Sequence, residues 1–294
     1  MADGGEGTLD ALGGPNRTTT VSGPLGDPVE AGWRLASRRA VIEMAQASGL
    51  ALLDEVDAVA ASTYGTGELI AAAVEAGATH VLVGLGGSAT TDGGSGALRA
   101  LYPTSQLRGV RIEVACDVTT PFTDAARVFA PQKGASPAQV AFLTRRLEAL
   151  VDQYREQYGV DVSELEGAGA AGGLAGGLAC VGAALVPGVE LVGDALGLPD
   201  LIDEADVVVT GEGHLDAESF EGKVVGGVAE LARASGVPCV AVVGDADPVE
   251  TDLPVVSLVA RFGRERALDD TAECLGEVAE ELLDQAVGAD GRVR

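Results

Sequence analysis

The feature that most constrains this fold is an apolar run that leads directly into a loop rich in glycine. The stretch "VLVGLGGSATTDGGSGAL" (81–98) starts as a buried strand and then holds glycine, serine, threonine and one aspartate. A strand, a glycine loop and a helix in this order direct backbone N–H groups and a helix N-terminus at an anion. Three alternatives follow: a phosphate loop, a dinucleotide loop, or a plain strand-to-helix turn.

The second half of the chain alternates strand and helix patterns. Apolar, β-branched runs occupy 205–211, 238–244 and 253–260, and helical spacing marks 224–236 and 270–287. Continuous apolar strands between helices indicate a parallel sheet covered on both faces.

The first half is more mixed. Residues 18–36 alternate and turn like antiparallel strands. Helical segments are predicted at 37–48 and 67–76, each closed by a glycine, Gly49 and Gly77, in the C′ position. We therefore expect two α/β domains.

Further elements are predicted between these halves. Buried strands are expected at 79–85 and 111–116. Ser136 and Pro137 have the residue types of an N-cap and a first helical position, so a helix should follow through Gly159.

The composition restricts the core and the partners. Aromatic residues make up 3% of the chain and glycine contributes 42 residues, so the core must consist of Ala, Val and Leu with close backbone packing. A net charge of −26 disfavours nucleic acid and anionic membranes as partners, and reflects adaptation to high salt or a general composition bias. The uncharged run 167–186 has the length of a membrane span, but its Gly and Ala content is too weakly apolar for one.

The cysteines and the N-terminus predict a cytoplasmic protein. Cys116, Cys180, Cys239 and Cys274 show no CxxC pair or zinc spacing, and the only histidines are His80 and His214. Free thiols are typical of the cytosol. "MADGGEGT" has neither the basic nor the apolar region of a signal peptide. The sequence leaves open whether the chain forms a homo-oligomer.

Two nucleotide-binding patterns fail on the residues. Gly84, Gly86 and Ala89 satisfy G-x-G-x-x-A, but no acidic residue stands near 104–109 to hold a ribose. A Walker A motif fails because Val224 follows Gly222-Lys223 and no glycine precedes them at 217. The hydroxyls of the 81–98 loop and Asp92 still suit phosphate oxygens and Mg²⁺.

The lysines give a further indication of a site. The chain has 17 arginines and two lysines, Lys133 and Lys223, and both lie in glycine-flanked segments. A composition that replaces Lys by Arg would keep lysine where a compact ammonium is needed, although two cases could also arise by chance. Lys133 lies in a short polar turn, so we expect its truncation to open no cavity in the core.

Eight motifs in order resemble the bacterial glycerate kinase family. They are "ADGGEGT" (2–8), "VIEMAQASGL" (41–50), "STYGTGELI" (62–70), "GLGGSATTDGG" (84–94), "CDV" (116–118), "PQKGAS" (131–136), "GAGAAGGL" (167–174) and "TGEG..D....GK" (210–223). The resemblance implies ATP-dependent phosphorylation of D-glycerate, with 2-phosphoglycerate favoured over 3-phosphoglycerate. The alternatives are a kinase of another small hydroxy acid and a non-catalytic homologue that binds a small organic acid.

The resemblance also implies a domain layout. A Rossmann-like domain would comprise 1–15 and 196–294, and a second α/β domain, 16–195, would be inserted into it. The family's usual N-terminal strand and helix would be missing from this chain, and a few tens of residues would be missing between Tyr102 and Arg111. His214, Glu218 and Ser219 replace the Arg, Gln and Thr usual in the family.

The motifs locate the expected site residues. The phosphate-binding set comprises Gly86, Gly87, Ser88, Thr90, Gly94, Gly169, Gly172 and Lys223. Lys133 would meet the glycerate carboxylate or the moving phosphate. Asp117, at a strand end, is the expected base, with Asp92 as its competitor. Glu212 and Asp216 are the expected Mg²⁺ ligands.

The charge excess predicts that salt stabilises the fold. The chain has 45 acidic and 19 basic residues, so the carboxylates in excess repel one another. Added salt screens that repulsion. Thermal midpoints recorded from low to molar KCl should therefore climb. A flat or falling series would show that the acidic bias has no energetic consequence.

Overall fold

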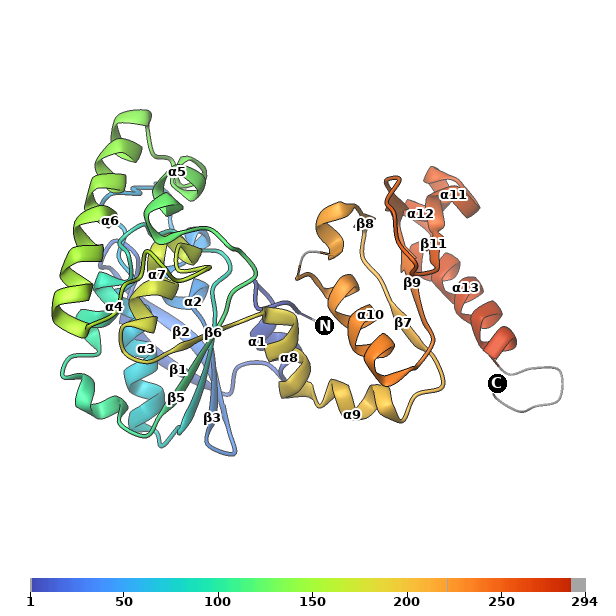
Figure 1. Ribbon diagram of the computed structural model, residues 1–294, viewed down its shortest axis with the longest axis horizontal. Helices are drawn as coiled ribbons and strands as arrows, with labels where there is room; N and C mark the ends of the chain where they lie inside the picture. The colour runs from blue at the N-terminus through green and yellow to red at the C-terminus, as the bar shows by residue number, and fades with distance from the viewer. Residues whose placement is uncertain (1, 221, 287–294) are drawn as a thin grey trace. The chain divides into compact units, whose positions relative to one another are not determined.

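The computed structural model describes residues 2–220 and 222–286 as two compact units that meet at Val192 and Gly193 (Figure 1). Both units combine helices with parallel strands, which confirms the predicted mixed α/β class. The sequence placed the main border between 195 and 196.

A six-stranded sheet forms the centre of the first unit. Its first two pairings are antiparallel and the next three are parallel, so the predicted antiparallel start at 18–36 is confirmed. The strands, in their spatial order, are β1 (Arg17–Ser22), β2 (Pro28–Ala36), β3 (Arg39–Glu43), β4 (His80–Gly84), β5 (Arg111–Ala115) and β6 (Ala184–Val186).

The helix predicted at 37–48 is largely wrong. Residues Arg39–Glu43 form β3, between β2 and β4, and only α2 (Ala45–Ser48) is helical. The run Ala40–Ile42 is buried, and a short, wholly buried strand has the same continuous apolar pattern as a buried helix.

The two predicted C′ glycines differ in conformation. Gly77 follows α3 (Tyr64–Glu75) with a left-handed φ of 95°, as expected. Gly49 is extended, with φ −85° and ψ 151°. A Cβ on Gly49 would lie 2.2 Å from the carbonyl oxygen of Ala45, so the chain needs glycine there for close packing.

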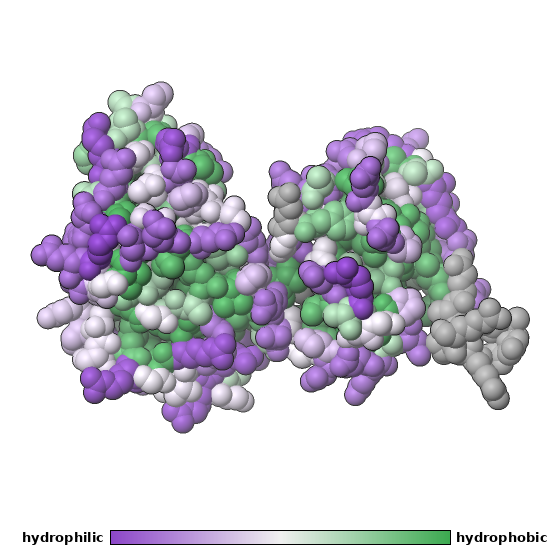
Figure 2. All heavy atoms as spheres, viewed as in Figure 1, coloured by the Kyte–Doolittle hydropathy of each residue, from purple (hydrophilic) through white to green (hydrophobic). Residues whose placement is uncertain are grey.

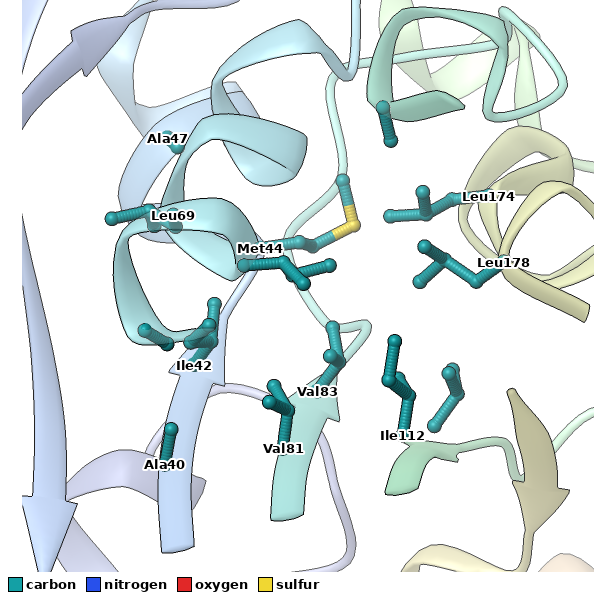
Figure 3. Close-up of a cluster of buried hydrophobic side chains, with 14 of the residues drawn as sticks. Ala40, Ile42, Met44, Ala47, Leu69, Val81, Val83, Ile112, Leu174 and Leu178 are labelled. Carbon is teal, nitrogen blue, oxygen red and sulfur yellow. The ribbon is translucent and has the colours of Figure 1, made fainter. Parts of the chain in front are cut away.

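The main core lies between this sheet and the helices α3 and α7 (Ala170–Ala179) (Figure 3). Met44 lies among Leu69 of α3 and Leu174 and Leu178 of α7. Ala, Val, Leu and Ile supply most of the remaining members, as the composition predicted.

A second apolar cluster packs α5 (Ala125–Phe129) against the long helix α6 (Pro137–Tyr158). Ser136 caps α6: its hydroxyl accepts from the N–H of Gln139, whose side chain accepts from the N–H of Ser136. The predicted start of this helix is confirmed. The other helical elements of the unit are α1 (Thr8–Ala11), η1 (Leu50–Leu52), α4 (Ser95–Ala100), η2 (Thr104–Leu107), η3 (Phe122–Asp124) and η4 (Pro131–Lys133).

The uncharged run 167–186 folds into α7 and β6. Ala171, Gly172 and Gly173 all have left-handed backbone angles, so the chain reverses sharply inside α7. In residues 2–220 and 222–286, every helix is too short or too polar to cross a membrane.

The second unit contains a three-stranded parallel sheet in the order β11 (Val255–Ser257), β9 (Cys239–Val243), β7 (Val208–Thr210). A short parallel pair, β8 (His214–Leu215) and β10 (Asp245–Ala246), follows the carboxyl ends of β7 and β9. Apolar clusters pack on both faces of β9, which confirms the predicted parallel sheet with both faces covered.

The helical elements of the second unit are η5 (Ala217–Phe220), α10 (Val224–Ser235), α11 (Leu258–Phe262), α12 (Arg264–Asp269) and α13 (Thr271–Ala286). Before them, α8 (Gly188–Leu196) spans the border between the units and α9 (Leu198–Asp203) follows it.

The described residues of the N-terminal segment lie against the six-stranded sheet. Gly4 accepts from the N–H of Leu85, and Leu9 donates to the Glu43 carboxylate over 2.7 Å. The sequence had assigned residues 1–15 to the C-terminal domain. In each unit, hydrophilic residues spread over much of the visible surface, in keeping with the large net charge (Figure 2).

Candidate active site

A cleft of about 800 Å³ opens in the first unit at the carboxyl ends of its parallel strands. Its walls include the loop after β4, the loop after β5 and the N-terminal segment, and one side is closed by η4 and the start of α7. Ligands of α/β proteins bind at this edge of the sheet, and the volume suits a nucleotide-sized molecule.

The predicted glycine loop contributes Gly86, Gly87 and Ser88 to the cleft. Gly87 has a left-handed φ of 68°, and a Cβ on Gly86 would lie 2.6 Å from the backbone nitrogen of Glu6. Glycine is therefore required at both positions, by conformation and by close contact with the N-terminal segment. No group within residues 2–220 and 222–286 accepts a hydrogen bond from the N–H groups of Gly86, Gly87 and Ser88.

Lys133 reaches this loop from η4. Its ammonium donates to the carbonyl of Thr90 and to the hydroxyl of Ser88, 3.3 Å away, and its side chain is 2% exposed. None of the ion pairs among the described residues involves it. Burial lowers the pKa of Lys133 from 10.5 to about 8, and the negative charge of Asp92 opposes this shift.

Lys133 lies in a short turn, as predicted, but its side chain is buried, so the expectation that its truncation opens no cavity is wrong. The polar residues around it predict exposure, and Gln132 and Gly134 are indeed exposed. The lysine alone turns inward, because the 3₁₀ turn Pro131–Lys133 directs its long side chain at the glycine loop.

Asp92 lies beneath the loop and does not line the cleft. Its side chain is 1% exposed and accepts from the N–H groups of Thr63, Gly94 and Gly96 over 2.9–3.1 Å. The Thr63 hydroxyl donates to it as well. This carboxylate therefore holds the loop to the N-termini of α3 and α4.

Asp117 lines the cleft, at the end of β5 as predicted. One carboxylate oxygen accepts from the N–H of Gly188 over 2.6 Å. Although the side chain reaches solvent, the surrounding protein removes enough water to raise the pKa of Asp117 from 3.8 to about 6. The bond from Gly188 opposes this shift and the charge of Asp3 adds to it.

Three predicted phosphate glycines allow close backbone packing behind the cleft, two of them at the glycine loop and Gly169 at the segment after β5. A Cβ on Gly172 would lie 2.0 Å from the carbonyl oxygen of Thr90, and one on Gly94 would lie 2.9 Å from the Cα of Gly177. Gly169 likewise meets the carbonyl of Pro121 at 2.4 Å. None of the three lines the cleft, and neither does Thr90, whose side chain is buried.

The remaining predicted residues belong to the second unit. Asp216 accepts from the N–H and hydroxyl of Ser219, and the ammonium of the half-buried Lys223 lies 3.3 Å from the Glu218 carboxylate. One oxygen of Glu212 is buried without a hydrogen-bond partner. The described residues contain no group of three His, Cys, Asp or Glu side chains placed to hold a metal ion.

The sequence reasoning missed two cleft carboxylates, Asp3 and Glu6. Asp3 accepts from the N–H of Gly5 over 3.2 Å, and Glu6 lies against Gly87. The motif "ADGGEGT" was recognised but no role was assigned to its acids. Glycines around acidic residues at the edge of a sheet were the available signal.

Comparisons with known proteins show the family of the chain and a similar fold. A model of the "Glycerate kinase family" matches residues 1–105 and 102–289. A glycerate kinase of Halalkalibacterium halodurans is 41% identical over 284 residues, 83% of this chain and 75% of the relative. A glycerate 2-kinase of Escherichia coli K12 is 39% identical, over 83% of this chain and 74% of the relative. The crystal structure of a protein described as glycerate kinase 2 of Salmonella typhimurium LT2 superposes with a TM-score of 0.79 at 34% identity, covering 96% of this chain and 88% of that one.

The burial of Lys133 predicts a difference in stability between two substitutions. Lys133→Ala removes three buried methylene groups, whereas Lys133→Met keeps most of that volume. At about 0.8 kcal/mol per methylene, the alanine variant should be less stable than the methionine variant by about 2 kcal/mol. Urea unfolding measures the difference. Gln132→Ala, an exposed neighbour, is the control and should change stability by less than about 0.5 kcal/mol. Equal stability of the two Lys133 variants would show that the side chain is not buried in solution.

Proposed function

This chain belongs to the glycerate kinase family, and we propose that it transfers the γ-phosphoryl group of ATP to the 2-hydroxyl of D-glycerate. The observation that supports this most directly is the buried ammonium of Lys133, which has no carboxylate partner among the described ion pairs. A buried charge without a counter-ion is costly, and an anionic ligand in the cleft would supply one.

The glycine loop suits the phosphate chain of ATP. Gly86 and Gly87 let the backbone approach a ligand closely, and the unpaired N–H groups at 86–88 can donate to phosphate oxygens. The Ser88 hydroxyl and the ammonium of Lys133 lie together at the same place. Phosphoryl transfer depends mainly on such positioning and on charge stabilisation, so this arrangement fits the reaction.

The other charges in the cleft fit a divalent cation. Asp3, Glu6 and Asp117 line it beside a single lysine, so two anionic substrates would be repelled without a further positive charge. Mg²⁺ binds through one or two carboxylates together with substrate phosphates. We assign it to Asp3 and Glu6, instead of Glu212 and Asp216, because Asp3 and Glu6 line the cleft. When bound, Mg²⁺ would neutralise charge on the phosphates.

Asp117 is the proposed base. Its second carboxylate oxygen does not take part in the bond from Gly188, and a pKa of about 6 leaves it ionised at neutral pH yet able to accept a proton. Asp92 is less suited to this role, because five protein groups already donate to its buried carboxylate. Transfer at the 2-hydroxyl follows from the relative that is named a glycerate 2-kinase.

We also propose a cytoplasmic location with a small-molecule substrate. All four cysteines are free thiols in the structure, as expected in a reducing compartment. The net charge of −26 argues against nucleic acid as a partner.

A coupled ADP assay tests the function. The purified chain should consume ATP only with Mg²⁺ and D-glycerate, and turnover should exceed that with lactate, glycolate or tartronate. Lys133→Met should lower kcat/KM by about 10²-fold or more, since it removes one electrostatic stabiliser. Faster turnover of another acid would indicate a different hydroxy acid kinase. Binding of glycerate without turnover would indicate a non-catalytic homologue.

The two shifted groups predict a bell-shaped pH dependence of kcat/KM. Asp117 must be ionised, so activity should fall as the pH drops through about 6. Lys133 must be protonated, so activity should fall as the pH rises through about 8. In Lys133→Arg, the remaining kcat/KM should no longer fall as the pH rises through about 8. In Asp117→Asn, it should no longer fall as the pH drops through about 6. An unchanged limb in either variant would remove that residue from its role.

A further inference from the structure

One wall of the cleft is apolar, and the chemistry of phosphoryl transfer leaves it without a role. The name covers three apolar lining residues on the segments that contact the phosphate loop: Leu50 and Ala51, from η1, and Phe129, the last residue of α5. The side chains of Leu50 and Phe129 are half-buried and that of Ala51 is exposed, and Phe129 also packs against the apolar cluster of α5 and α6. Phe129 is one of five phenylalanines in the chain, and Phe122, which precedes it by seven residues, is wholly buried.

We propose that this wall, together with Gln132, binds the adenine ring of the phosphoryl donor. The proposal rests on the proposed function, in which ATP is the donor. A flat aromatic base offers an apolar face to a phenylalanine ring and to aliphatic side chains, and stacking of this kind contributes about 1–3 kcal/mol per base.

The wall adjoins the phosphate loop directly. The N–H of Leu50 donates to the carbonyl of Gly87 over 2.8 Å. On the other side, Phe129 precedes Lys133 by four residues, and Lys133 contacts Ser88. A base on the wall therefore places its phosphates along 86–88 and next to the ammonium. Of the two anions considered for Lys133, this arrangement selects the donor phosphate over the glycerate carboxylate.

Gln132 supplies polar recognition at the edge of the wall. Its exposed side chain lines the cleft. In the sequence, Gln132 stands between Phe129 and Lys133. A glutamine amide carries one acceptor and one donor side by side, which match the amino group and an adjacent ring nitrogen of adenine.

The acceptor acid does not explain the wall. Glycerate carries an oxygen on each of its three carbons, so aliphatic and aromatic side chains offer it little. The polar end of the cleft, with Asp3 and Asp117, suits this substrate better.

Phe129→Ala tests the proposal, with Phe142→Ala as a matched control. Phe142 is an exposed phenylalanine of α6 outside the cleft. In Phe129→Ala, the Kd of ATP and of AMP, measured by calorimetry, should rise by about 5- to 100-fold, the range that corresponds to loss of one stacked base. The KM of glycerate should change less than twofold. Phe142→Ala should change neither.

Phe129→Leu and Gln132→Ala complete the design. The leucine variant keeps apolar volume and guards against a misfolded alanine variant, which thermal melting would reveal. It should weaken ATP binding by less than the alanine variant does. Gln132→Ala should raise the Kd of ATP and of AMP by about 2- to 10-fold, the loss of one hydrogen bond, without changing the KM of glycerate.

The outcomes separate this proposal from the proposed function. If the wild type binds AMP and Phe129→Ala does not, the base site stands even when glycerate is not phosphorylated. Unchanged nucleotide binding in Phe129→Ala and Phe129→Leu would overturn it. A selective loss of glycerate affinity in Phe129→Ala would overturn it as well, because the wall would then belong to the acceptor. Wild-type protein that binds no nucleotide would refute both proposals.

Discussion

The buried carboxylate of Asp92 is the contact on which the cleft depends. It accepts from the N–H groups of Thr63, at the start of α3, and of Gly94 and Gly96, at the start of α4. Charge-assisted hydrogen bonds to backbone donors are stronger than neutral ones, and this carboxylate is almost fully shielded from water. It thereby fixes the loop from which the carbonyl of Thr90 meets Lys133. Its negative charge also keeps the pKa of that lysine from falling further.

Close backbone packing lets these buried contacts form. Gly172 lies so near Thr90 that any side chain would strike its carbonyl, and Gly94 meets Gly177 across the interface of α4 with α7. Larger residues would push α7 away from the loop. The glycines that the sequence assigned to phosphate binding therefore divide into two groups. Gly86 and Gly87 line the cleft, and the others make room for the backbone behind it.

Much of the fold could be predicted from the sequence, because periodicity reports burial directly. The strand before the glycine loop, the capped helix from Pro137 and the parallel strands of the second unit all follow from local patterns. The strand Arg39–Glu43 could not be distinguished from a helix, since its short apolar run is buried on every side. The site was harder to predict. Lys133 looks exposed among its neighbours, and only tertiary structure turns it inward, while Asp3 and Glu6 reach the cleft through a segment that crosses the sheet edge.

A strongly acidic protein that binds anionic substrates needs local positive charge in its cleft. A chain with net charge −26 repels phosphate and carboxylate at long range, but salt screens that repulsion beyond about 10 Å. Short-range attraction must then come from a few fixed positive groups. An exposed arginine would be largely hydrated, whereas a buried ammonium held by a carbonyl and a hydroxyl has already lost much of its water. In the proposed function, an arriving phosphate would therefore meet a desolvated cation, and the interaction would be stronger than that of the same pair at the surface. The scarcity of lysine in this chain and the burial of Lys133 are consistent with this single role.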